Sequence, residues 1–306
     1  MSRRGAVAVA GAIALPVAAL SLRAATAQPR PGHPYLAGAP LLIAHRGGAA
    51  LAPENTPLAF GRALEWWNAD ILELDVQPTR DGDAVVIHDA TVDRTTDGRG
   101  RVVDLTLAEL RELDAGYRFS TDGGRSYPFR GRGERIPTLC EVLEAFPTAR
   151  VNVEIKDGRA QERVWEVVEE LGASSRVLIA TEKQGNRSRF SAYPGPTSAS
   201  SAELVRFLLL YNVHGTAFFQ PRTDAFQMPE RHRGRQVLSP RFIQEAHAKN
   251  LPVHVWTVNE EADMRRLLEW GVDGIITDRL DVLARVLHEM EGRPLPPGSP
   301  GGEDGA

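Results

Sequence analysis

The sequence predicts an α/β protein, and within that class a (β/α)8 TIM barrel with a small insertion after the second strand. Short apolar runs alternate with segments of helical periodicity, and eight such runs can be counted between residues 41 and 291. A barrel of eight strand-helix units typically needs about 250 residues, which fits the length of this segment. With 42% apolar residues in a chain of 306, there is material for one large core.

The strand and helix pattern can be followed from the first unit onward. The run 41–44 is a short strand buried on both sides, residues 55–68 carry apolar side chains at helical spacing, and the second strand covers 71–76. Further helices are expected at 138–146, 161–171, 201–213, 239–249, 260–270 and 280–290, and further strands at 150–156, 176–181, 196–200, 225–228, 252–258 and 273–277. The strands near 196–200 and 225–228 are poorly marked.

An open, doubly wound sheet is the competing architecture, because periodicity alone does not separate it from a closed barrel. The GxGxxG and Walker signatures that nucleotide-binding members of that class carry are absent from the sequence. We therefore favour the barrel.

The two ends of the chain differ in composition from the middle. Residues 1–27 have the parts of an export signal: Arg3 and Arg4, an uncharged apolar run shorter than the roughly 20 residues of a bilayer span, and a small-x-small ending. We expect an exported protein, either periplasmic, secreted or anchored to the membrane by an uncleaved signal. Residues 28–40 predict a linker and residues 292–306 a disordered tail.

The barrel domain is expected to span 41–291, with the insertion at about 90–136. A loop of that length after the second strand would lie over the mouth of a barrel. It would act there as a lid or a binding loop, or be a neutral addition.

Charge and cysteine content exclude several classes of protein. The formal net charge is −4, with 40 acidic residues against 36 basic ones, so there is no basic signature and we expect no nucleic-acid partner. Cys140 is the only cysteine, which excludes an intramolecular disulfide. No oligomeric state is predicted.

Three carboxylates stand inside strand patterns that should be buried. Glu73 and Asp75 are two residues apart, which places both side chains on one side of the second strand, and Glu154 and Lys156 repeat this spacing on the third. Converging carboxylates repel one another unless a cation neutralises them, and oxygen ligands suit Mg²⁺ or Ca²⁺. The alternative is a structural cluster in which Lys156 and arginines pair with the carboxylates.

Two histidines are expected beside this cluster. His45 directly follows the first strand, and His88 follows the apolar stretch 84–87. Since the pKa of an unperturbed histidine lies near neutrality, the pair could serve as base and acid around one reacting centre. Arg46 and Lys156 are cations available for a phosphate group.

The motifs continue in a fixed order along the chain. They read His45-Arg46-Gly47, Pro53-Glu54-Asn55-Thr56, Glu73-Leu74-Asp75-Val76, Thr79-Arg80-Asp81-Gly82, Val86-Ile87-His88-Asp89, Asp93-Arg94-Thr95-Thr96, Ile136-Pro137-Thr138-Leu139, Asn152-Val153-Glu154-Ile155-Lys156, Val255-Trp256-Thr257-Val258-Asn259, Gly271-Val272-Asp273-Gly274 and Thr277-Asp278. In this order they resemble the glycerophosphodiester phosphodiesterase family over nearly all of 41–291.

The resemblance implies a fold and a set of site residues. The fold is the (β/α)8 barrel with its insertion. A divalent metal would bind Glu73, Asp75 and Glu154, His45 and His88 would be the catalytic acid and base, Arg46 and Lys156 would contact phosphate, and Trp256 would line the apolar side of the substrate pocket. Packing within the barrel is the alternative role for Trp256.

The resemblance also implies an activity, the metal-dependent hydrolysis of a glycerophosphodiester to sn-glycerol 3-phosphate and an alcohol. The partner would be that small molecule, with transient contact with a membrane or lipid. Phospholipase-D-type cleavage of lysophospholipids or sphingolipids is the nearest alternative, and an exported phosphodiester-binding protein without turnover is an alternative of another class.

The sequence departs from the family pattern in two places. After the fourth strand, many relatives have a sequence like Ser-Phe, whereas this chain has Thr181-Glu182-Lys183-Gln184. The stretch 214–236 follows no pattern that can be assigned. These loops should form part of the rim, so the choice of substrate stays open.

Overall fold

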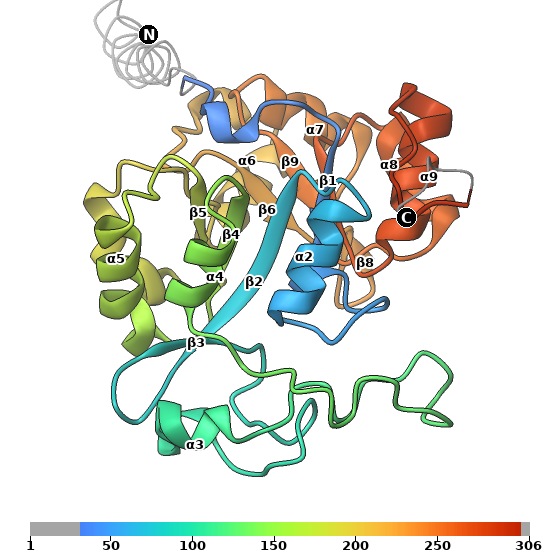
Figure 1. Cartoon of the computed structure of the whole chain (residues 1–306). Helices are drawn as coiled ribbons and strands as arrows, with labels where there is room; N and C mark the ends of the chain where they lie inside the picture. The colour runs from blue at the N-terminus through green and yellow to red at the C-terminus, as the bar shows by residue number, and fades with distance from the viewer. Residues whose placement is uncertain (1–30, 301–306) are drawn as a thin grey trace, which may run out of the picture.

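A parallel sheet curls around a buried centre and is surrounded by helices (Figure 1). The structure is a computed structural model that describes residues 31–300. Its strands run in the order β5-β4-β2-β1-β10-β9-β6. Their bounds are β1 (Leu41–Ala44), β2 (Ile71–Pro78), β4 (Arg150–Ile155), β5 (Val177–Ala180), β6 (Phe226–Met228), β9 (Val253–Val255) and β10 (Gly274–Thr277).

The barrel closes at the strand that the sequence marks most weakly. Thr197 forms a parallel bridge with Ile179 of β5, and Ser198 forms one with Ala225, directly before β6. Asp224 supports this contact by accepting a hydrogen bond from the Thr197 N–H at 2.9 Å. The predicted strand near 196–200 is therefore present as two bridge residues, and the chain forms the predicted (β/α)8 barrel.

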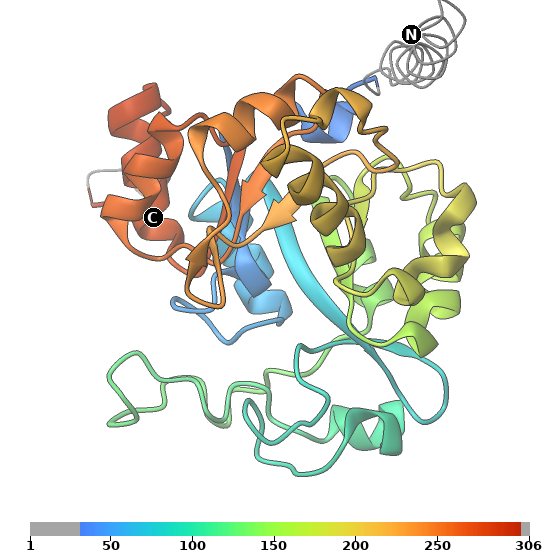
Figure 2. The same cartoon turned by 180° about the vertical axis from the view of Figure 1, so that it is seen from behind.

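The helices form the outer layer of the barrel (Figure 2). They are α2 (Pro57–Glu65), α4 (Leu139–Ala145), α5 (Gln161–Glu170), α6 (Ser201–Asn212), α7 (Pro240–His247), α8 (Glu261–Glu269) and α9 (Leu280–Glu291). Five of them lie within one residue of the predicted ranges, whereas α2 is shorter than the predicted 55–68 and α7 ends two residues before the predicted end at 249. The sequence shows no helix after β5, and there the structure has a 3-10 segment, η5 (Gln184–Ala192).

Alternation along the strands decides what fills the barrel. Leu72, Leu74 and Val76 of β2 belong to the cluster that packs against the helices, whereas Ile71 belongs to the inner cluster with Leu41. Glu73 and Asp75 share the inward face with Ile71, farther along the strand. The interior is therefore apolar at the amino ends of the strands and acidic toward their carboxyl ends.

The described part of the predicted linker is packed against the barrel. Tyr35 and Leu36, in the short helix η1 (Pro34–Leu36), are buried in the inner cluster. Arg150, at the start of β4, donates hydrogen bonds to the carbonyl oxygens of Tyr35 and Ala37 at 2.9 and 2.8 Å. Residues 31–40 therefore close the amino end of the barrel, because an aromatic ring and two paired carbonyls hold them there.

The described part of the predicted disordered tail is also ordered against the barrel. Arg293 forms two hydrogen bonds with the Asp70 carboxylate at 2.8 and 3.0 Å, and the Gly298 N–H donates to Trp66 O at 2.8 Å. The prediction of disorder is wrong for 292–300. Residues 301–306 and the predicted export signal at 1–27 lie outside the described residues, so the signal stays a prediction.

The insertion has its own small core and lies at the end of the barrel opposite η1 (Figure 1). It begins with β3 (Ala84–Val86), which pairs antiparallel with β2. It then contains η3 (Val102–Asp104) and α3 (Leu107–Arg111). The buried apolar residues that hold it together are Val85, Ile87, Val92, Val102, Leu110, Ala115 and Ile136.

The stretch 214–236, which the sequence leaves unassigned, contains η6 (Thr216–Phe218), β6 and a hairpin formed by β7 (Arg231–His232) and β8 (Arg235–Gln236). Among the described residues, no helix is both long and apolar enough to cross a membrane.

The Asp70 carboxylate should contribute more to stability than its partner Arg293. Asp70 also accepts a hydrogen bond from the N–H of the buried Leu42 at 2.8 Å, and Asp70→Ala leaves that donor unpaired. We expect Asp70→Ala to lower the free energy of unfolding by about 2 kcal/mol, and Arg293→Ala by about 1 kcal/mol or less. Urea denaturation followed by circular dichroism measures both values. Asp70→Asn, which keeps an acceptor for Leu42, should fall between them, and equal losses in all three would contradict this ranking.

Candidate active site

His45 and Asp278 are the first residues after two neighbouring strands. Ala44 of β1 is paired with Thr277 of β10, so the residues that follow lie side by side. The His45 Nδ1 and Asp278 Oδ1 atoms are 2.6 Å apart, and Asn259 donates a hydrogen bond to the other oxygen of Asp278 at 2.8 Å. Burial by itself would lower the pKa of His45, but the hydrogen bond to Asp278 and the nearby Glu73 raise it above the ordinary value.

The turn after β1 brings the backbone close to the carboxylates. Arg46 has a positive φ of 51°, and its N–H donates to Glu73 Oε2 at 2.9 Å. Gly47, at φ 82°, lies so close to α2 that a Cβ atom would stand 2.7 Å from the Cβ of Ala59. The glycine is required here because any side chain would collide with the helix.

The Arg46 side chain is shared between two acids. Its Nη1 donates to Glu54 Oε1 at 2.9 Å, and its Nε lies 3.3 Å from Asp75 Oδ2. Both contacts are away from bulk solvent, since all three side chains are largely buried. Arg46 is therefore fixed in direction before any ligand arrives.

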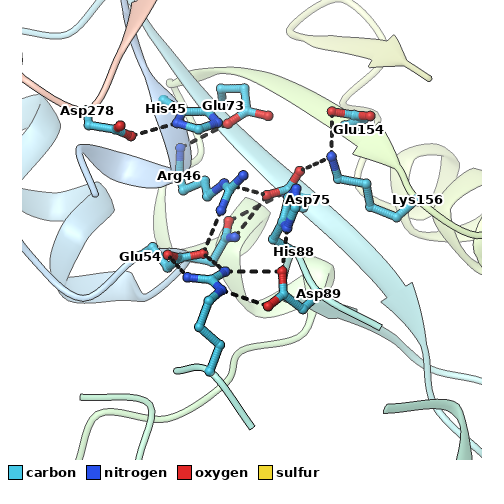
Figure 3. A network of polar contacts seen from close by, with 12 residues as sticks. His45, Arg46, Glu54, Glu73, Asp75, His88, Asp89, Glu154, Lys156 and Asp278 are labelled. Carbon is cyan, nitrogen blue, oxygen red and sulfur yellow. Dashed lines mark hydrogen bonds and ion pairs between the residues drawn. The ribbon is translucent and has the colours of Figure 1, made fainter. Parts of the chain in front are cut away.

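The register of β2 and β4 brings the three predicted metal ligands together. Asp75 is paired with Glu154, and Glu73 with Asn152. Ligand oxygens of Glu73, Asp75 and Glu154 lie within 4.8 Å of one another. Lys156 Nζ lies 3.0 Å from Asp75 Oδ1 and 2.9 Å from Glu154 Oε2 (Figure 3). The structure thus brings together the carboxylate cluster and the lysine that the sequence offered as its alternative partner.

The carboxylates respond differently to burial. Burial and the neighbouring Asp75 raise the pKa of Glu73 to about 7. Burial also acts to raise the pKa of Asp75, but Lys156 and Arg46 outweigh it and the pKa of Asp75 is lowered. The pKa of Glu154 is raised, mainly by burial. The neighbouring cations therefore stabilise the charged form of Asp75 but not that of Glu73.

His88 reaches the site through the β2-β3 hairpin. The Ile87 N–H donates to Asp75 O at 2.9 Å, and Gln77 donates a side-chain hydrogen bond to His88 O at 3.0 Å. The His88 Nδ1 atom lies 2.6 Å from Asp89 Oδ1, which repeats the pairing of His45 with Asp278 (Figure 3).

Arg94, from the insertion, joins the two halves of this network. It donates to both oxygens of Glu54, at 2.8 and 2.6 Å, and to both oxygens of Asp89, at 2.7 and 3.2 Å. One guanidinium therefore positions the acid that holds Arg46 and the acid that holds His88. The sequence motifs contain Glu54, Asp89, Arg94 and Asp278 but predict no role for them, because the pairing of these side chains depends on tertiary contacts.

The predicted site residues surround a cavity of about 140 Å³. Of the eight predicted site residues, seven line it: His45, Arg46, Glu73, His88, Glu154, Lys156 and Trp256. The eighth, Asp75, is almost fully buried against them. Trp256 also packs against the inner apolar cluster of the barrel. It therefore lines the cavity and contributes to barrel packing, which the sequence had offered as alternatives.

The three carboxylates fit a divalent cation. All their donors are oxygen atoms, which suits Mg²⁺ or Ca²⁺. Among residues 31–300, nothing donates a well-directed hydrogen bond to the buried Asp75 Oδ1, although Lys156 Nζ is 3.0 Å away. The Lys156 ammonium is the partner of this oxygen among the described residues, and the neighbouring Glu73 has a raised pKa, so a further cation would stabilise the cluster.

Known proteins of one family resemble the chain over most of its length. The model of the glycerophosphoryl diester phosphodiesterase family matches residues 45–282. The chain is 38% identical over 261 residues to a glycerophosphodiester phosphodiesterase of Caldanaerobacter subterraneus subsp. tengcongensis, covering 81% of this chain and 98% of that protein. It is 31% identical to one of Bacillus subtilis, covering 80% and 86%.

A solved structure has the same fold. The glycerophosphodiester phosphodiesterase from Agrobacterium tumefaciens superposes with a TM-score of 0.64 at 28% identity, covering 80% of this chain and 99% of that one.

Replacing Asp278 with Asn should lower the pKa of His45, because burial then acts without the opposing charge. In the wild type the raised pKa stabilises the folded protein at pH values below the ordinary pKa of about 6.5, and this contribution is lost as pH rises through the folded value. Asp278→Asn should remove it. NMR titration of the His45 ring measures the shift, with Asp273→Asn, beside His247, as the matched control. An unchanged His45 pKa in Asp278→Asn would contradict the assignment.

Proposed function

Because the chain belongs to the glycerophosphoryl diester phosphodiesterase family, we propose that it hydrolyses glycerophosphodiesters to sn-glycerol 3-phosphate and an alcohol, with His45 and His88 as acid and base. One observation carries the proposal: two histidines, two cations and an acidic cluster line a single small cavity. We further propose that the enzyme is exported, on the sequence of residues 1–27 alone.

Glu73, Asp75 and Glu154 would hold a divalent cation, Mg²⁺ or Ca²⁺. When bound, the cation would polarise a phosphoryl oxygen and neutralise part of the negative charge of the phosphodiester. The protein contributes a preformed set of oxygens on two paired strands, so little rearrangement is needed.

Arg46 and Lys156 would orient the phosphate and stabilise the charge that develops on its oxygens. Arg46 offers a planar fork, already held by Glu54, and Lys156 offers a point charge from the opposite side of the cluster. Both are aligned by buried acids, so they act in a fixed environment.

The two histidines would move the protons. The oxygen of water, or of the free 2-hydroxyl of the glycerol unit, attacks phosphorus while the bond from phosphorus to the alcohol oxygen breaks. The raised pKa of His45 favours it as the acid that protonates the departing alcohol, and His88 takes the proton of the nucleophile. Asp278 and Asp89 hold the Nδ1 side of each ring, which leaves Nε2 for the reaction. Attack by the 2-hydroxyl would give a cyclic phosphate first.

Removing an acid-base group or a metal-ligand group should greatly lower the rate of turnover. We expect His45→Ala and Glu73→Gln each to lower kcat/KM for glycerophosphocholine by about 10²–10⁴-fold, measured as release of sn-glycerol 3-phosphate. His247→Ala is the matched control, since His247 forms an ion pair with Asp273 of the same 2.6 Å length away from the cavity. Wild-type activity in His45→Ala would overturn the mechanism. Binding of substrate by the wild type without turnover would favour the non-enzymatic alternative.

Metal should stabilise the folded protein and restore activity after chelation. Ligands that bind only the folded state raise the melting temperature, so adding Mg²⁺ or Ca²⁺ to chelator-treated protein should raise it for the wild type. Glu73→Gln should show little rise. An equal rise in both proteins would mean that the cation binds elsewhere.

A further inference from the structure

The catalytic cavity opens into a larger one. The smaller has a volume of about 140 Å³ and the larger a volume of about 270 Å³. They share five lining residues: Glu154, Ala180, Glu182, Gln227 and Trp256. Because a phosphodiester carries two ester groups, a phosphate held by Arg46 and Lys156 in the smaller cavity can place one of them in the larger.

The two cavities differ in charge. Arg46 and Lys156 line the smaller one, and both suit the negative charge of a phosphate. Among residues 31–300, the larger cavity is lined by Glu154, Glu182 and His232 but by no arginine or lysine. A ligand that occupies both cavities is therefore matched best when it is negative in the first and positive in the second.

Glu182 is the acid that is available to a cationic ligand. Glu154 already lies 2.9 Å from Lys156 Nζ and belongs to the carboxylate cluster. No arginine, lysine or histidine of the described chain forms an ion pair with the exposed Glu182 side chain. The backbone of Glu182 is fixed just after β5, because the Ser201 N–H donates to Glu182 O at 3.0 Å. The fold therefore holds this carboxylate where the two cavities meet.

The apolar walls of the larger cavity decide which kind of cation fits. Leu204, Leu208 and Val237 line it, and the Trp256 indole lines both cavities. An ammonium group with N–H donors would lose hydrogen bonds to water against these side chains, at a cost in free energy. A quaternary ammonium group has no such donor, its methyl groups contact apolar walls, and a carboxylate and an indole ring both attract its charge. The lining therefore favours a quaternary ammonium group.

We propose that Glu182 and Trp256 bind a quaternary ammonium group on the departing alcohol, so that the enzyme prefers phosphodiesters of such a cationic alcohol to those of a neutral one. The inference rests on the proposed function, because Arg46 and Lys156 set where the phosphate lies. It adds a role for Glu182, which stands in the loop where the sequence departs from the family pattern. Glu182 selects among substrates and takes no part in bond breaking.

Two esters of sn-glycerol 3-phosphate that have the same shape and differ in charge test this proposal. One is the choline ester, and the other is the 3,3-dimethylbutyl ester, in which carbon replaces the quaternary nitrogen. We expect Glu182→Gln to lower the ratio of kcat/KM for the choline ester to that for the neutral ester by about three- to tenfold, because the attraction between the carboxylate and the ammonium group is lost.

Glu162→Gln is the matched control, since it removes the same charge outside both cavities. Glu162 is exposed and forms an ion pair with Arg189 at 2.9 Å. We expect its substitution to leave the ratio of the two esters at the wild-type value, and circular dichroism checks that both variants fold. An unchanged ratio in folded Glu182→Gln would overturn the proposal, even if kcat/KM falls equally for both esters. Equal changes of the ratio in both variants would assign the effect to net charge and would overturn it as well.

A binding measurement separates the ammonium site from the proposed function. The His45→Ala protein, with Mg²⁺ or Ca²⁺ present, is titrated with each ester by isothermal titration calorimetry, with and without Glu182→Gln. We expect Glu182→Gln to weaken binding of the choline ester by about three- to tenfold more than binding of the neutral ester. Equal effects on both esters would refute the ammonium site, whatever the activity. The expected binding pattern without turnover of any ester by the wild type would instead reject the proposed function.

Discussion

The burial of Glu73, Asp75 and Glu154 inside the barrel is the constraint on which the rest of the site depends. Each carboxylate lost water when the strands closed around it, and that loss must be offset by fixed positive charge or hydrogen bonds. Lys156 and the Arg46 side chain offset it at Asp75, while the Arg46 N–H reaches Glu73. Compensation is incomplete at Glu73, whose pKa stays near 7. The fold thus leaves charge to be neutralised at the place where a phosphodiester would bind.

A second layer of acids extends this arrangement to the histidines and to the insertion. Asp278 and Asp89 each hold a ring nitrogen, and Arg94 ties Asp89 to Glu54, which in turn holds Arg46. Side chains from the insertion and from the loop after β1 are therefore fixed together. Such pre-organisation lowers the cost of ordering the groups at the moment of reaction. The insertion serves the site as a structural support, besides lying at its mouth.

The sequence predicted what depends on local periodicity and missed what depends on closure. The alternation of side chains along a strand predicted that Glu73 and Asp75 lie on one face of β2. The same rule predicted that Glu154 and Lys156 lie on one face of the neighbouring strand, β4. The pairing of His45 with Asp278 needs the register of β1 against β10, residues far apart in the chain. The segment 292–300 is held by the ion pair of Arg293 with Asp70 at the amino end of the barrel. Composition and hydropathy do not predict such a contact. The strand near Thr197 had a weak sequence pattern because only two of its residues, Thr197 and Ser198, form bridges to neighbouring strands.

At the floor of the barrel, the end at which the strands begin, a segment after α9 meets the segment before β1. Arg293 donates a hydrogen bond to Pro40 O at 3.3 Å, next to the segment that Arg150 holds. These contacts lie away from the catalytic cavity, so this end of the barrel can carry an attachment without covering the site. A carrier or solid support attached at this floor would leave the catalytic mouth facing the solution.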